Sequence, residues 1–243
     1  MKNECSNKRS KQHYITSHDV AIKGYREIKR LEKNYYLRKL GKTETIVVRL
    51  DGQGLTKKFL RGKLDSPEHF HAMKKMMEGI VKYCSYINFA YSANDEVSFV
   101  IDGKALSSDT INYRAEKLLT YLSGYISSLY TLNVNEGTDN KQAYSFDARI
   151  VLLKDGVTSK DYYSKRQKIA IGYFIEKLCT KKRLPQKVYT FEEIRGQIKS
   201  SGDEWDYPRY ASHGYVGFYN KEKKWIIEEA KDFEKEWSSY NIT

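Results

Sequence analysis

Hydrophobic and polar residues recur along the chain with two periods, which predicts a protein built of both helices and strands. Helices are indicated where apolar residues recur every three to four positions, at residues 67–84, 107–129 and 158–179. Strands are indicated by short runs rich in β-branched and aromatic residues, at residues 45–51, 87–91, 96–101 and 145–153. The predicted order is therefore β-α-β-β-α-β, followed by one more helix.

This order of elements is the split βαβ pattern of ferredoxin-like folds, an α+β architecture that also forms the palm of many nucleotidyl polymerases. The first and third strands of this topology lie next to each other at the centre of the sheet. We therefore expect the end of the strand at 45–51 to lie beside the turn of the hairpin at 87–101.

Shifts in composition divide the rest of the chain. We expect, in order, a disordered N-terminus at 1–12, a helical segment at 13–42, a palm-like catalytic domain at 43–180 and a C-terminal α/β extension at 181–243. Within the extension, Thr190 is placed to cap a helix that runs to residue 199. A hairpin at 215–227 and a helix at 228–237 are expected to follow.

The charge balance points to a polyanionic partner. The 243 residues include 43 Lys and Arg against 31 Asp and Glu, a net charge of +12. A basic excess of this size favours nucleic acid, because each neutralised phosphate releases counterions. A basic protein without such a partner is the alternative. The 21 tyrosines are suited to stack bases, although packing in the core also accounts for them.

Cysteine usage and hydropathy indicate the compartment. Cys5, Cys84 and Cys179 are far apart and odd in number, which predicts neither a disulfide framework nor a zinc site. No apolar run approaches the roughly 18–20 residues of a membrane span. The N-terminus lacks the apolar middle of a signal peptide. We expect a cytoplasmic protein without a membrane partner.

Two acidic motifs stand at the ends of predicted strands. Asp51 is followed at once by Gly52 and Gly54, and glycines let the backbone approach a ligand while its N–H groups cradle phosphates. An ordinary Asp-Gly turn is the alternative. Asp95 and Glu96 lie beside the hairpin turn, where solvated acids are the alternative.

The two motifs together indicate a metal site. Adjacent positions on a strand point to opposite faces, so Asp95 and Glu96 should not both face one metal unless the turn twists them. The predicted topology brings Asp51 and Asp95 to one edge of the sheet. Two carboxylates there suit Mg²⁺, and a pair of such ions can stabilise the attacking and leaving oxygens of phosphoryl transfer.

Four ordered motifs carry a resemblance to a known family. The segments VVRLDGQG, AYSANDEVSFV, FDARIVL and DYYSKRQ resemble motifs of the tRNA-histidine guanylyltransferase superfamily, the 3′-to-5′ polymerases. The resemblance spans about residues 43–180. It implies a polymerase-like palm that binds two Mg²⁺ ions and uses GTP and ATP. It also implies addition of nucleotides to the 5′ end of tRNA or another RNA by a homo-oligomer, a tetramer.

The resemblance implies roles for individual residues. Metal would be held by Asp51, the carbonyl of Gly52 and Asp95, with Glu96 as the accompanying acid. The nucleotide pocket would be lined by Asp51, Gly52, Gln53, Gly54, Leu55, Thr56, Asn94 and Asp95. Arg114 and Lys117 would contact the triphosphate, and a solvated helix face is their alternative.

Basic residues near these motifs are the candidate RNA contacts. Lys57, Lys58 and Arg61 cluster just after the first aspartate, and we expect them to contact the RNA backbone. Arg149 and Arg166 match family positions, and a structural ion pair with Asp147 or Asp161 is their alternative.

Several positions depart from the family pattern. Thr56 and His69 stand where the family carries a His and the last residue of a Lys-Pro-Asn-Asp run. Asn94 replaces the usual Ser, and the His-Ile-Asn-Asn stretch that usually follows the Arg-Gln pair is missing. These changes favour a divergent member that acts on other RNA 5′ ends. The five histidines show no ligand spacing, and His69 and His71 are interpreted as surface residues.

Two other classes of protein fit the same pattern. A palm-fold signalling nucleotidyltransferase or cyclase would share the architecture, but residues 93–97 read ANDEV rather than a GG[DE]EF-like turn. A catalytically inactive RNA-binding module would share the basic charge, but Asp51 and Asp95 are both present.

Overall fold

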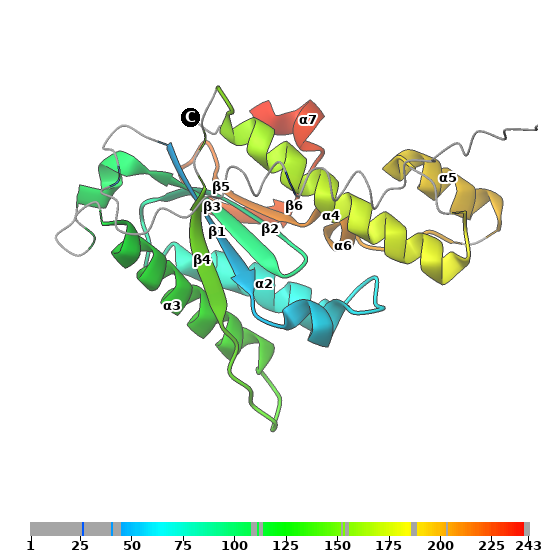
Figure 1. Ribbon diagram of the computed structural model, residues 1–243, viewed down its shortest axis with the longest axis horizontal. Helices are drawn as coiled ribbons and strands as arrows, with labels where there is room; N and C mark the ends of the chain where they lie inside the picture. The colour runs from blue at the N-terminus through cyan, green and yellow to red at the C-terminus, as the bar shows by residue number, and fades with distance from the viewer. Residues whose placement is uncertain are drawn as a thin grey trace, which may run out of the picture.

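An antiparallel sheet of six strands forms the centre of the described chain (Figure 1). The computed structural model describes residues 26, 40, 45–107, 111, 114–151, 153, 156–185, 189–202 and 204–240. The strands are β1 (Thr45–Gly52), β2 (Ile87–Ala93), β3 (Glu96–Asp102), β4 (Phe146–Val151), β5 (Tyr215–Tyr219) and β6 (Trp225–Glu229). Their order in the sheet is β4-β1-β3-β2-β5-β6. The first four are the ferredoxin-like palm, so the predicted α+β fold and the central β1–β3 pair are confirmed.

Helices cover both faces of the sheet. The long ones are α2 (Pro67–Ile80), α3 (Ala115–Val134), α4 (Ser159–Lys182) and α5 (Phe191–Ser200). Shorter turns of helix are η1 (Thr56–Leu60), η2 (Gly103–Ser107), α6 (Tyr210–His213), α7 (Phe233–Glu236) and η3 (Trp237–Tyr240). Figure 1 shows α4 crossing the sheet on the opposite face from α2 and α3.

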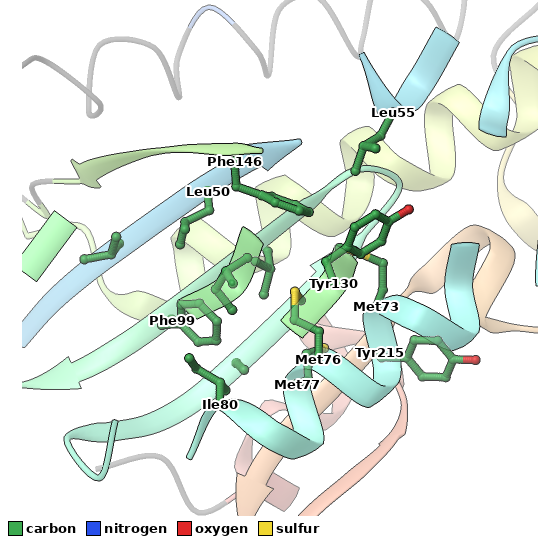
Figure 2. Close-up of a cluster of buried hydrophobic side chains, with 14 of the residues drawn as sticks. Leu50, Leu55, Met73, Met76, Met77, Ile80, Phe99, Tyr130, Phe146 and Tyr215 are labelled. Atoms are coloured by element: carbon green, nitrogen blue, oxygen red, sulfur yellow. The ribbon is translucent and has the colours of Figure 1, made fainter. Parts of the chain in front are cut away.

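Alternation along β1 divides the core into two layers. Ile46, Val48 and Leu50 pack against α2 and α3, whereas Val47 packs in the second cluster with tyrosines of α4. Figure 2 shows the first cluster, in which Leu50, Phe99 and Phe146 of the sheet share one apolar layer with α2 residues such as Met76 and with Tyr130 of α3. Because alternate side chains of a strand point to opposite faces, the polar Arg49 and Asp51 share the α4 face with Val47.

Helix starts follow local capping chemistry. The Thr158 and Thr190 side chains each accept from the backbone N–H three residues on, within complete capping boxes, which confirms the predicted cap at Thr190. Three predicted bounds were wrong. The helix expected at 107–129 spans Ala115–Val134, after the turn η2, and α2 ends at Ile80 rather than at residue 84.

The predicted C-terminal extension contributes two strands, β5 and β6, to the same sheet as the palm. Strand β5 pairs with β2, with Phe218 opposite Phe89, so the predicted β5–β6 hairpin widens the palm sheet itself. This covers an edge of β2 that would otherwise expose unpaired backbone groups. The helix expected at 228–237 is shorter, because β6 continues to Glu229 and α7 spans Phe233–Glu236.

Some expectations concern other parts of the chain. The predicted segment at 1–12 and most of that at 13–42 lie outside the described residues. Cys84 and Cys179 are free and buried. Across the described ranges, no helix combines the length and apolar character needed to cross a membrane.

Candidate active site

The ends of β1 and β3 bring the two acidic motifs together, as predicted. Asp51 lies opposite Glu96 in the β1–β3 register, and the Gly52 amide donates to the Asp95 carbonyl at 2.8 Å. Asp51 and Asp95 both line a cavity of about 430 Å³ between the sheet edge and α4, here called the inner cavity. Both also line an adjoining outer cavity of about 580 Å³, which lies over the turn at 52–54 and η1.

Thr56 orients the carboxylate of Asp95. Its backbone N–H donates to Asp95 Oδ2 at 3.2 Å, and its hydroxyl donates to the same oxygen. Leu55, which we predicted in the nucleotide pocket, is fully buried and lines neither cavity. Its side chain lies with the hydrophobic cluster in Figure 2, so that prediction was wrong for the side chain.

Gly52 is required by the close approach of these segments. A Cβ atom at this position would lie 2.2 Å from Cδ1 of Leu55 and 3.1 Å from the carbonyl oxygen of Asp95. The predicted phosphate cradle is partly occupied by the protein itself. The Gly52 amide is bonded to Asp95, and the Gln53 amide donates to the Ser145 carbonyl at 2.9 Å.

Glu96 holds two arginines rather than facing the cavity as a free acid. Arg49 Nε donates to one carboxylate oxygen at 3.0 Å, and Arg166 Nε donates to the other at 2.7 Å. All three side chains are buried. Arg166 lines the inner cavity from α4 while its Nε is engaged by Glu96, so its contact with RNA stays a prediction. Its ion-pair partner is Glu96, not the predicted Asp147 or Asp161.

Asp51 carries a perturbed charge. Burial raises the pKa of its carboxyl, and nearby Asp95 and Asp147 raise that pKa further. Arg49, whose Nη2 lies 2.9 Å from Asp51 Oδ1, opposes this by lowering the pKa. Converging carboxylates that repel one another are the donor set that a hard cation relieves.

The donor set fits Mg²⁺ in composition. Mg²⁺ commonly binds through one or two carboxylates and completes its shell with water and substrate phosphate. Asp51 and Asp95 are the two carboxylates that line both cavities, and Gly52 lines the outer cavity beside them. Within the described ranges, no group of three His, Cys, Asp or Glu side chains forms a closed metal site. The residues therefore suit a site that substrate oxygens complete.

Arg149 and Asp147 form the ion pair that we had kept as the alternative to RNA contact. Arg149 Nη2 lies against Asp147 Oδ2, and Gln53 Nε2 donates to Asp147 Oδ1 at 2.9 Å. Asp147 lies opposite Asp51 in the β1–β4 register. This pair thus ties β4 to the turn after Asp51.

Arg114 and Lys117 do not reach this site within one chain. They stand at the start of α3, whereas Tyr130 near its end contacts His69 below the Asn94 turn. At 1.5 Å per residue, Arg114 lies roughly 24 Å from Tyr130 along the helix. Neither residue lines either cavity. The triphosphate contact of Arg114 and Lys117 therefore stays a prediction that the two cavities do not account for.

The basic cluster after Asp51 divides in two. Lys57 and Arg61 line the outer cavity. Lys58 instead donates to Gln142 and Tyr144 in the segment between α3 and β4. Only the first two therefore remain candidates for direct contact with substrate beside the carboxylates.

His69 was wrongly interpreted as a surface residue. It is fully buried, with Nδ1 2.6 Å from the Tyr130 hydroxyl and Nε2 2.7 Å from the Asn94 carbonyl. Burial lowers the pKa of its ring. Asn94 adopts a left-handed conformation, with φ of 52°. His69 thus supports the turn that carries Asp95, and its helical spacing from Met73 was a signal for an inward position.

One face of α4 supplies lining residues that sequence reasoning missed. Ile169, Ala170, Tyr173 and Lys177 line the inner cavity together with Arg166. Their spacing from Arg166 is helical, so the family motif at Arg166 was the available signal. The sequence did not show which face of this helix met the carboxylates.

A ferredoxin-like sheet whose central strands end in two carboxylates has the architecture of the polymerase palm. The chain belongs to the tRNAHis guanylyltransferase family, whose sequence profile matches residues 25–154. It is similar to the tRNA(His) guanylyltransferase of Neurospora crassa, with 32% identity over 130 residues. That match covers 50% of this chain and 43% of the relative, so the chain spans less than half of the relative's length.

Solved structures share the fold. A bacterial tRNA(His) guanylyltransferase-like protein in complex with ATP aligns with a TM-score of 0.63 at 17% identity, over 90% of this chain and 96% of its own. The corresponding complex with GTP gives a TM-score of 0.59 at 16% identity, with the same coverage. The Saccharomyces cerevisiae enzyme gives 0.59 at 21% identity, over 84% of this chain and 95% of its own.

Proposed function

We propose that this protein is a Mg²⁺-dependent nucleotidyltransferase that adds nucleotides to the 5′ end of tRNA or another RNA, using GTP and ATP. The observation that carries the proposal is the convergence of Asp51 and Asp95 at the end of the palm sheet, where both line the same two cavities. The family and the nucleotide complexes of the bacterial relatives support it.

The residues divide into ligands and supports. Asp51, Asp95 and the Gly52 carbonyl would hold two Mg²⁺ ions. Mg²⁺ bound there would lower the pKa of an attacking hydroxyl and offset charge on the leaving phosphate. Thr56 fixes Asp95, and Arg49 fixes Asp51. Glu96 acts through the two arginines that it holds.

The reaction that follows runs from 3′ to 5′. The 3′-hydroxyl oxygen of the incoming nucleotide forms a bond to the phosphorus that is attached to the 5′ oxygen of the RNA. Pyrophosphate leaves if that end is a triphosphate, and AMP leaves if it is adenylylated. The hydroxyl proton passes to solvent or to the leaving group. The missing His-Ile-Asn-Asn stretch after Gln167, together with the departures at Thr56, His69 and Asn94, favours repair of 5′-truncated RNA over guanylylation of full-length tRNA-histidine. From the family resemblance we also propose that the protein assembles as a tetramer.

The carboxylates provide the direct test. Asp51→Ala and Asp95→Ala should each abolish incorporation of labelled GTP or ATP into a 5′-truncated tRNA. The control is Asp139→Ala, which removes an exposed carboxylate that lines neither cavity. Circular dichroism checks that each variant folds. Activity within tenfold of wild type in either cavity variant would contradict the proposal, and cyclic or dinucleotide products from GTP alone would favour a signalling enzyme.

A further inference from the structure

Lys177 stands where the two cavities join. The residues that line both of them are Asp51, Thr56, Leu60, Asp95 and Lys177. In this shared set, two side chains are acidic and Lys177 alone is cationic. A ligand that extends from one cavity into the other must therefore pass the two carboxylates and this amine.

The other cations around the junction are differently placed. Arg49 and Arg166 belong to the inner cavity and are engaged by Glu96 beneath it. Lys57 and Arg61 line only the outer cavity and are exposed. An anionic group at the junction itself would therefore meet Lys177 first.

The position of Lys177 is costly for a cation unless an anion compensates it. The side chain is partly buried, and burial lowers the pKa of its amine. Asp95 and the neighbouring Glu176 oppose this by raising the pKa. With Asp95 holding Mg²⁺ as proposed, a phosphate at the junction would supply a further negative charge beside this amine.

We infer that Lys177 binds a phosphate group of the substrate at the junction of the two cavities, an inference that rests on the proposed nucleotidyl transfer. The phosphate belongs either to the triphosphate of the incoming nucleotide or to the 5′ end of the RNA. A lysine suits this place because its ammonium is a compact charge that pairs well with phosphate oxygens.

The apolar side of the inner cavity fits the same arrangement. Ile169, Ala170 and Tyr173 line it along the α4 face that also carries Lys177. One face of a single helix therefore presents apolar surface and then a cation. A group with an apolar ring and an attached phosphate matches that order.

The test compares Lys177→Met, which keeps most of the apolar stem, with Lys177→Arg, which keeps the charge. The matched control is Lys181→Met. Lys181 lies one helical turn farther along α4, is exposed, and lines neither cavity. Melting temperatures establish that each variant folds.

The first arm measures binding of ATP, and of adenosine as the phosphate-free probe, by calorimetry in the presence of Mg²⁺. Loss of one charge-assisted contact should weaken ATP binding about tenfold in Lys177→Met, with adenosine binding unchanged. Lys177→Arg should retain at least part of the ATP affinity. The control should bind both probes as the wild type does.

The second arm compares one truncated tRNA bearing a 5′-monophosphate with the same RNA bearing a 5′-hydroxyl. The ratio of the two binding affinities, 5′-monophosphate over 5′-hydroxyl, should fall about tenfold in Lys177→Met. The same ratio should stay at the wild-type value in Lys181→Met. Weaker ATP binding in the first arm would show that Lys177 contacts the nucleotide. A smaller preference for the phosphorylated RNA in the second arm would show that it contacts the RNA end.

Two outcomes overturn the inference, and they are distinguishable. If the wild-type protein transfers nucleotides and Lys177→Met matches it in both arms, the inference fails alone and Lys177 serves only to balance Asp95. If the wild type transfers no nucleotide and binds neither ATP nor RNA, the proposed function fails as well.

Discussion

The most informative single substitution is Glu96→Gln, which keeps the shape of the side chain and removes its negative charge. Glu96 is 7% exposed, and its partners Arg49 and Arg166 are 6% and 5% exposed. The carboxylate joins the centre of the sheet to α4 through Nε contacts of 3.0 Å and 2.7 Å. After the substitution, two buried guanidinium groups would face a neutral amide.

The size of the effect follows from that burial. Removing one partner of a buried ion pair costs about 3–5 kcal/mol, because the remaining charge is left without compensation. Arg49 keeps Asp51 as a partner, so we expect the lower part of this range, about 3 kcal/mol. That is a large share of the roughly 5–15 kcal/mol by which domains are stable.

Urea unfolding followed by tryptophan fluorescence measures this change. The matched control is Asp147→Asn, which disrupts the more exposed pair with Arg149. A pair of that kind contributes about 1 kcal/mol or less. Nucleotide transfer should be measured well below the unfolding midpoint, so that loss of fold and loss of chemistry are separated.

One result would refute the structural role. That result is a free energy of unfolding for Glu96→Gln within about 1 kcal/mol of the wild-type value, together with complete loss of nucleotide transfer. Glu96 would then act in the chemistry itself. A double variant with Arg166→Leu gives a second check. It should recover part of the lost stability, because it removes one of the two buried arginines that lose the Glu96 carboxylate.

Three further substitutions test the site from other sides. His69→Phe should lower the free energy of unfolding by about 1–3 kcal/mol, because it leaves buried hydrogen-bonding groups without their partner. The control is His71→Phe at an exposed position. Equal unfolding curves for the two variants would contradict the role of His69 in supporting the turn. Gly52→Ala should reduce both stability and nucleotide transfer, because its Cβ would lie 2.2 Å from a neighbouring side chain. Gly124→Ala, whose Cβ meets open space within a helix, should leave stability unchanged or raise it. A lower stability for Gly124→Ala than for Gly52→Ala would be inconsistent with the site geometry. Burial raises the pKa of Asp51, so its contribution to stability is full below the ordinary pKa of 3.8 and is lost as pH rises through the higher folded value. In EDTA, the melting temperature of Asp51→Asn relative to wild type should therefore rise over that range, because the amide stays neutral while the Asp51 carboxyl ionises. A difference that does not change with pH would place the titrating group elsewhere.

The amino-acid sequence by itself determined the order of strands and helices in the palm. Local patterns carried this information: the β-branched run before Asp51 and the spacing of apolar residues in α2. Such patterns distinguish a strand from a helix directly, because side chains repeat with a different period in each. The split βαβ order then places neighbouring strands by topology. This is why the approach of Asp51 to Asp95 was predictable although 44 positions separate them in the printed sequence.

Tertiary structure decided which polar groups meet. Glu96 could have faced solvent, and its contact with Arg166 depends on how α4 crosses the sheet, a packing choice that no local pattern encodes. The burial of His69 and the place of Lys177 depend on the same kind of packing. The distance of Arg114 from the carboxylates follows from the length and direction of α3.

The C-terminal strands make the same point for the fold. Their hairpin was visible as two apolar runs around a polar turn, because a hairpin is a local structure. That β5 pairs with β2 was not visible, since strand pairing between distant segments depends on which edge of the sheet remains unpaired and on the apolar surface that each pairing buries.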